Sequence, residues 1–163
     1  MYQSPELNSA PGSGGNPFDE RRVGTFTSVG RRETDTAKMN QDRGIVIHPF
    51  NGDASQSLFC IFDGHGDAGH NVAEFMMLRL PELLERDGTR LATDELTEKS
   101  LLENILLADR LVQGAASLQS SSSGCTALVL LVRSGRAWLA TIGDSRAEVY
   151  GYAHYRQYRQ YRY

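Results

Sequence analysis

Residues 58–66 read LFCIFDGHG, an apolar run that ends in an acid, a flexible turn and an imidazole. The run from Leu58 to Phe62 is apolar without alternation, which is typical of a strand covered on both faces. Asp63 is therefore predicted at a strand end, where a carboxylate is fixed in position and still open to solvent. Gly64 lets the backbone approach closely and offers a carbonyl oxygen, a hard ligand like the carboxylate. His65 adjoins both and can give up a proton near neutral pH.

An ordinary turn after a strand would explain this motif, taken alone, equally well. Apolar patterns elsewhere predict further strands at 24–29, 44–47, 126–132, 137–142 and 146–150. Helical spacing predicts helices over 67–86 and 94–113, the first split by Pro81 and the second capped by Thr93 or Asp94. Their apolar stripes are expected to be buried on a sheet, and they contain Val72, Met76, Leu101 and Ile105. The order of strands, two helices and strands predicts an α+β fold with an antiparallel sheet.

Composition excludes several classes of protein. Hydrophobic residues make up 40% of the chain and charged residues 23%, which is a globular composition. The net charge of −3 gives no reason to expect nucleic acid as a partner. The longest apolar run, 127–132, is too short to span a membrane, and the N-terminus lacks a secretory signal. We therefore expect an intracellular protein, cytoplasmic or nuclear, in which Cys60 and Cys125 are reduced and buried.

Two terminal segments differ from the body of the chain. Residues 1–20 are rich in Ser, Pro, Gly and Asn, and this composition predicts a disordered leader. Residues 152–163 contain a repeat of Tyr, Arg and Gln whose period of three suits neither a strand nor a helix. We expect a solvated tail there, with stacking on single-stranded nucleic acid as the alternative. The domain itself is expected to occupy residues 21–151.

Three more short motifs stand at predicted strand edges: NQD at 40–42, SGCTA at 123–127 and GDSR at 143–146. In this order, and together with Asp-Gly-His, they resemble the PPM-type (type 2C) metal-dependent protein serine/threonine phosphatases over residues 24–151. The resemblance implies a four-layer α-β-β-α sandwich of antiparallel sheets flanked by helices, here truncated at the C-terminus. It also implies hydrolysis of phosphoserine and phosphothreonine in protein partners.

The resemblance assigns a role to each matched residue. Asp63 matches the aspartate that bridges two Mg²⁺ or Mn²⁺ ions, and Gly64 the glycine whose carbonyl binds one of them. His65 matches the histidine proposed as general acid, and Asp42 the acid that orients metal-bound water. Asp144 matches the aspartate associated with a third metal. Structural positions around that site are matched by Thr126, Ser145 and Arg146.

Two positions depart from the family pattern near the start of the domain. Gln41 stands where many members have a glutamate metal ligand, although the Asn-Gln-Asp form also looks like a family variant. The phosphate-binding arginine is expected four residues before Gln41, where this chain has Ala37. A nearby basic residue would have to replace it, and the choices are Lys38, Arg32 and Arg31.

The larger departure is that the two later aspartates of the family's bimetal site have no counterpart after Gly151. Mg²⁺ and Mn²⁺ take six oxygen ligands, and a pair of ions needs several carboxylates to offset its charge. Two hypotheses follow. The first is a phosphatase acting on phosphoserine and phosphothreonine. The second is an inactive product, either a truncated fragment or a pseudophosphatase that binds phosphorylated partners, with an unpaired sheet edge after Tyr150; for this exact chain the sequence favours the second.

Overall fold

The computed structural model describes residues 23–30, 38–148, 150 and, as backbone only, 156–160. The chain divides into two compact units, residues 1–40 and 41–163. The predicted leader, 1–20, lies outside the described residues. In the first unit, residues 23–30 contain no strand, so the strand predicted for 24–29 was wrong. Phe26 is 89% exposed, and an apolar segment without a partner strand gains little from an extended backbone.

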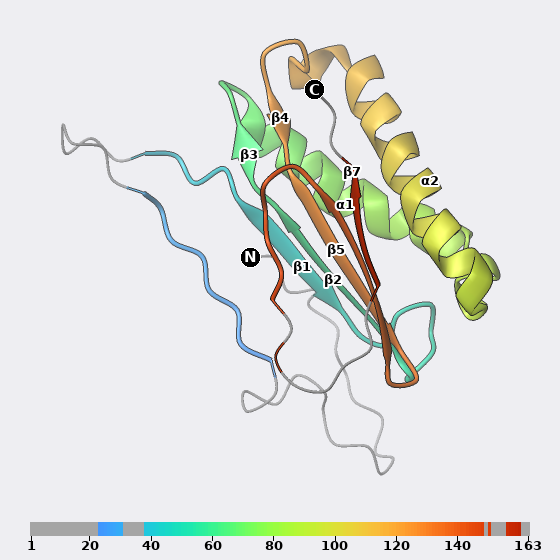
Figure 1. The fold of residues 1–163 in the computed structure, drawn as a ribbon. Helices are drawn as coiled ribbons and strands as arrows, with labels where there is room; N and C mark the ends of the chain where they lie inside the picture. Colours follow the sequence, from blue (N-terminus) through green and yellow to red (C-terminus); the bar gives the residue numbers. More distant parts are fainter. Residues whose placement is uncertain (1–22, 31–37, 149, 151–155, 161–163) are drawn as a thin grey trace. The chain divides into compact units, whose positions relative to one another are not determined.

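The second unit is built on a five-stranded sheet in the order β1-β2-β5-β6-β7 (Figure 1). Its strands are β1 (Arg43–Ile47), β2 (Gln56–Phe62), β5 (Ala127–Arg133), β6 (Arg136–Ile142) and β7 (Arg156–Gln160). The first four are neighbours in antiparallel register, as the sequence predicts. A separate pair joins β3 (Gly64–His65) to β4 (Gly124–Cys125).

The strand β7 corrects two expectations. The repeat tail was expected to be solvated, yet Arg156–Gln160 pairs with β6 in parallel. A ladder of backbone hydrogen bonds does not depend on side-chain periodicity, which is why the three-residue repeat misled the prediction. The outer edge of β6 is therefore paired and not open. The strand predicted for 146–150 is absent from residues 146–148 and 150, because the chain turns away from β6 at Gly143, whose φ is +88°.

Two long helices, α1 (Gly69–Arg86) and α2 (Asp94–Gly114), pack against the sheet (Figure 1). The four stripe residues named above are all buried, which confirms the predicted helical faces. Pro81 was expected to split the first helix, but α1 runs through it without a break. Proline costs one backbone hydrogen bond in a helix interior, and here burial of the apolar ring offsets that cost.

The N-terminus of α2 follows the prediction in part. Thr93 occupies the N-cap position with an extended backbone, but its side chain makes no capping hydrogen bond. Asp94 and Glu95 lie in the first turn, where acidic groups are favoured by the helix dipole. No helix in the described part of the chain is both long and apolar enough to cross a bilayer.

A polar cluster, which no sequence pattern predicts, joins the end of α1 to α2. The carboxylate of Asp87 accepts hydrogen bonds from the Ser100 hydroxyl, from the Asn104 amide at 3.0 Å and from Arg90 at 3.0 Å. Ser100 and Asn104 are buried. Because a buried donor without an acceptor is costly, one carboxylate fixes the angle at which the two helices meet.

We expect Asp87→Ala to lower the free energy of unfolding by about 1–3 kcal/mol, because it removes the acceptor shared by two buried donors. Urea unfolding followed by circular dichroism measures this change. The control is Glu85→Ala, which removes an exposed carboxylate two residues earlier, in the last turn of α1. Equal losses in the two variants would show that the cluster does not hold the helices together.

Candidate active site

The register of the sheet brings three of the sequence motifs to one end. Arg43 pairs with Phe62 in β1 and β2, so Asp42 and Asp63 are the next residues at the same end. Thr126 is held beside Asp63 by two hydrogen bonds. The backbone N–H of Thr126 donates to the Asp63 carbonyl at 2.9 Å, and the N–H of Asp63 donates to the Thr126 hydroxyl at 3.1 Å. These bonds fix the backbone of Asp63 while its side chain stays exposed.

Thr126 also links this point to the fourth motif. Its hydroxyl shares a hydrogen bond of 2.6 Å with the hydroxyl of Ser145, the residue after Asp144. At Gly143 an added Cβ would lie 2.8 Å from the Thr126 methyl group, so only glycine permits this approach. The predicted structural role of Thr126 and Ser145 therefore corresponds to a direct contact. Arg146 is exposed at this end of the sheet.

Gly64 lies in a cradle formed by backbone. A Cβ added there would lie 2.5 Å from the Gly69 carbonyl oxygen and 2.6 Å from that of Gln41. Any side chain would displace the start of α1 or the residue before Asp42. The close packing holds the Gly64 peptide in one orientation, which suits a residue whose carbonyl oxygen is a candidate ligand.

Gln41 closes the turn that follows Gly64. Its side-chain nitrogen donates a hydrogen bond of 2.7 Å to the carbonyl oxygen of Gly66, whose φ is +81°. A glutamate, the residue that many family members have here, could not donate this bond. The amide thus ties the Asp-Gly-His-Gly turn to the segment that leads into β1, and its oxygen is the side-chain atom left to act as a ligand.

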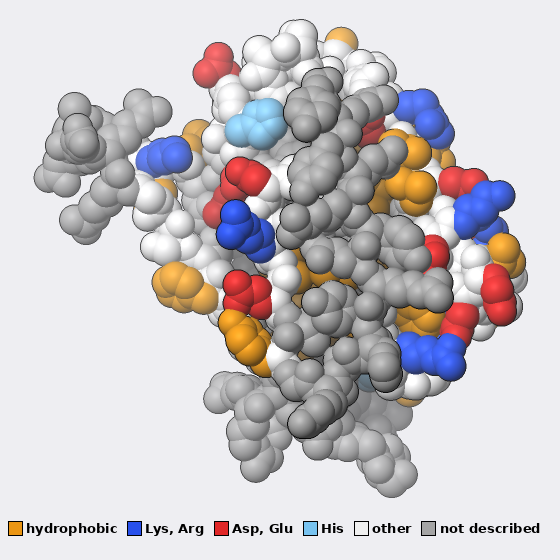
Figure 2. Space-filling view, viewed as in Figure 1, with side chains coloured by type: hydrophobic (Ala, Val, Ile, Leu, Met, Phe, Trp, Pro, Cys, Tyr) orange, Lys and Arg blue, Asp and Glu red, His pale blue; other side chains and the backbone are white. Residues whose placement is uncertain are grey.

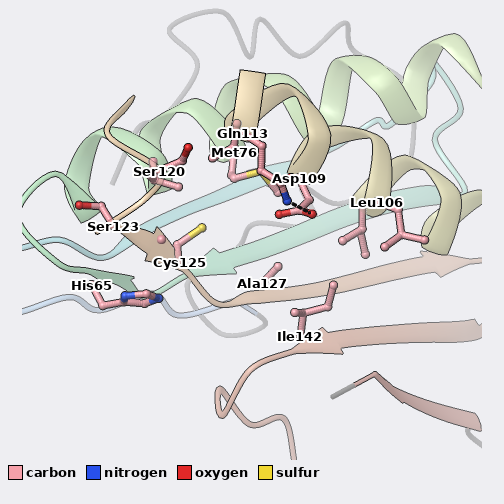
Figure 3. A pocket seen from close by; sticks show the side chains of 14 residues that line it. His65, Met76, Leu106, Asp109, Gln113, Ser120, Ser123, Cys125, Ala127 and Ile142 are labelled. Carbon is pink, nitrogen blue, oxygen red and sulfur yellow. Dashed lines mark hydrogen bonds between the residues drawn. The ribbon is translucent and has the colours of Figure 1, made fainter. Parts of the chain in front are cut away.

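His65 has an exposed side chain and lies opposite Gly124 in the β3–β4 pair. A Cβ added at Gly124 would lie 2.9 Å from the imidazole, so the ring rests directly on that backbone. Figure 3 shows the imidazole at the edge of a pocket whose far side is formed by the helix α2. The Gly124 backbone therefore supports one side of the imidazole ring, and the other side is accessible to a bound substrate. A proton donor must be accessible in this way.

The candidate ligands are oxygen donors, the kind that Mg²⁺ and Mn²⁺ prefer, so the residues at this end suit a hard divalent cation in their chemistry. Asp63, Asp42 and Asp144 lie at one end of the sheet, but in the described part of the chain no three His, Cys, Asp or Glu side chains could hold a metal ion together. Their roles as ligands stay predictions. Lys38 belongs to the first unit, and its role in binding phosphate stays a prediction too.

Sequence reasoning missed two features beside this site. Ser123 was interpreted only as part of a loop, but its hydroxyl accepts a hydrogen bond of 2.9 Å from the N–H of Ala68, which orders the start of α1. Cys125 is half-buried, not buried, whereas Cys60 is fully buried as expected. Burial raises the pKa of Cys125 to about 12, with smaller contributions from the charges of Asp109 and Asp63. The thiol is therefore protonated at neutral pH and is not a nucleophile.

Comparison with known proteins agrees with the motifs. The sequence model of the family described as Protein phosphatase 2C matches residues 24–155. The chain belongs to the protein phosphatase 2C family. The α+β fold agrees as well, because a crystal structure of a variant bacterial serine phosphatase matches with a TM-score of 0.58 and 26% sequence identity. That match covers 74% of this chain and 52% of the bacterial one.

Relatives in plants and in an animal are described as protein phosphatases. The chain is 35% identical over 112 residues to "Probable protein phosphatase 2C 35" of Arabidopsis thaliana, a match that covers 68% of this chain. It is 31% identical over 134 residues to "Protein phosphatase 1L" of Bos taurus, covering 79% of this chain. It spans 30% and 35% of the lengths of these two relatives.

We expect Gln41→Glu to loosen the turn at residues 63–66, although it introduces the residue that many family members carry. The carboxylate cannot donate to the Gly66 carbonyl, and the lost bond costs about 0.5–1.5 kcal/mol of stability. Hydrogen exchange at the amides of Gly64 and His65 should become faster. The same substitution at Gln119, which is exposed, is the control; unchanged exchange in Gln41→Glu would show that the bond does not hold the turn.

Proposed function

We propose that this protein is a metal-dependent hydrolase of phosphoserine and phosphothreonine in other proteins. The observation that carries the proposal is that residues 63–65 combine a backbone held by hydrogen bonds with exposed functional side chains. Thr126 and Gln41 hold this turn by hydrogen bonds of 2.7–3.1 Å to Asp63 and Gly66, while the side chains of Asp63 and His65 remain exposed. Preorganised groups of this kind lower a barrier because they do not have to reorient during the reaction.

The reaction is a displacement at phosphorus. The oxygen of a water molecule bonds to phosphorus, the bond from phosphorus to the serine or threonine oxygen breaks, and inorganic phosphate is released. His65 is suited to give its proton to the departing oxygen, which leaves as the hydroxyl of the protein partner. Asp42, opposite Asp63 in the register, is suited to orient the attacking water and take up its proton.

A divalent cation, Mg²⁺ or Mn²⁺, would neutralise the charge of the phosphate and make water a better nucleophile. Asp63 and the carbonyl of Gly64 are the first candidates to hold it, and Asp144 and the amide oxygen of Gln41 are further ones. Membership of a generally metal-dependent family supports this assignment. The free cysteines, Cys60 and Cys125, suit a reducing compartment, so we place the reaction in the cytoplasm or nucleus.

The test compares hydrolysis of p-nitrophenyl phosphate by the wild-type chain and by Asp63→Ala in millimolar Mn²⁺. We expect an Mn²⁺-dependent rate in the wild type that falls by about a hundredfold or more in the variant, as is usual when a preorganised charged group is removed from an active site. Glu85→Gln neutralises an exposed carboxylate on α1 and should keep the wild-type rate.

Equal background rates in the wild type and in Asp63→Ala would contradict the proposal for this chain. That result would favour the second hypothesis, in which the chain binds phosphorylated proteins without turning them over. Binding of a phosphoserine peptide, measured in the same preparation, separates that outcome from a misfolded sample. A misfolded sample would also lose the cooperative urea transition.

A further inference from the structure

A pocket of about 220 Å³ lies between α1, α2 and the strands beside them (Figure 3). Its walls are mainly apolar, with Met76 from α1, Leu106 from α2, Ala127 from β5 and Ile142 from β6. The volume equals that of about seven water molecules at about 30 Å³ each. It is smaller than the pockets of drug-sized ligands, which begin at about 300 Å³. The space therefore fits one large aliphatic or aromatic side chain.

The pocket is continuous with the candidate active site, because His65 lines it. The residue before His65, Gly64, lies in the backbone cradle described above. The imidazole ring of His65 lies at the rim of the pocket (Figure 3). Successive residues of an extended peptide are about 3.3 Å apart. A substrate whose phosphate lies at residues 63–65 would thus bring a flanking side chain to the pocket.

Away from the His65 rim, the wall of the pocket disfavours acidic side chains. Asp109 lines it, and its carboxylate is held by a hydrogen bond of 2.8 Å from the side chain of Gln113 (Figure 3). No lysine or arginine is among the described residues that line the pocket. An acid would therefore lose its hydration and meet a like charge, whereas an apolar side chain would gain from burial.

We propose that this pocket is a specificity subsite, which takes an apolar side chain that flanks the phosphorylated residue of the substrate. The inference rests on the proposed function, because it assumes that the phosphate binds at residues 63–65. It goes beyond that function by naming the substrate class: phosphoserine or phosphothreonine with leucine-like neighbours, and not with acidic ones.

Peptide binding measured by NMR tests the subsite without relying on turnover. The probes are two acetylated phosphoserine peptides that differ only in the residues flanking the phosphoserine, leucine in one and aspartate in the other. The amide signals of Gly64 and His65 report on the phosphate site, and the methyl signals of Leu106 and Ile142 report on the pocket. We expect the leucine peptide to shift both sets and to bind about tenfold more tightly, while the aspartate peptide shifts only the first set.

A pocket variant and a matched control complete the test. Leu106→Phe narrows the pocket and should reduce the affinity of the leucine peptide to that of the aspartate peptide. Leu102→Phe makes the same change one turn earlier on α2, at a side chain that is 42% exposed and does not line the pocket, and should have no effect.

Three results would overturn the subsite. They are binding of the leucine peptide without a response of the pocket methyl groups, unchanged affinity in Leu106→Phe, and equal affinity for the leucine and aspartate phosphopeptides. The proposed function fails separately, if neither phosphopeptide shifts the signals of Gly64 and His65. The subsite can thus fail while the phosphate site stands.

Discussion

The pairing of β2 with β1 on one side and β5 on the other is the constraint on which the rest of the structure depends. Both pairings are antiparallel, and both end within two residues of Asp63. A shift of one residue in either register would turn the core side chains of β2 outward. Because Leu58, Cys60 and Phe62 are almost fully buried against the helices, such a shift is costly. The core therefore fixes the position of Asp63.

The register of β2 with β1 and β5 thus determines both the apolar core and the position of the candidate site. Burial of alternate residues in β2 and β5 sets where the strands end, and the hydrogen bonds among Asp63, Thr126 and Ser145 join the strand ends. The glycines at 64 and 143 allow approaches that no other residue permits. The proposed reaction needs an exposed carboxylate and an exposed imidazole. Asp63 and His65 provide them on a backbone that is fixed by packing.

Much of this arrangement follows from the sequence, because it depends on local patterns. The apolar run of β2 and the helical stripes of α1 and α2 predict the strand, the helices and the buried helical faces correctly. The lack of alternation in β2 predicted cover on both faces, and this was wrong, because only alternate residues are buried and Ile61 is 52% exposed. The failures have physical causes. Pro81 is tolerated because its ring is buried, and β7 forms because a sheet edge accepts backbone of any side-chain pattern. The Asp87 cluster and the Gln41 bond join residues 13 to 25 positions apart, and no sequence pattern marks such contacts.

A divalent cation bound at the end of β2 is central to the proposed activity. Paramagnetic broadening by Mn²⁺ in the NMR spectrum of the full chain tests this binding directly, because broadening falls steeply with distance from the ion and weak binding suffices. We predict that the amides of Asp42, Asp63, Gly64 and Ser145 broaden first as Mn²⁺ is added, while those of Thr97 and Ser100 on α2 stay sharp. Broadening that begins at other acidic residues, such as Asp87 and Glu103, or that is uniform along the chain, would contradict the claim.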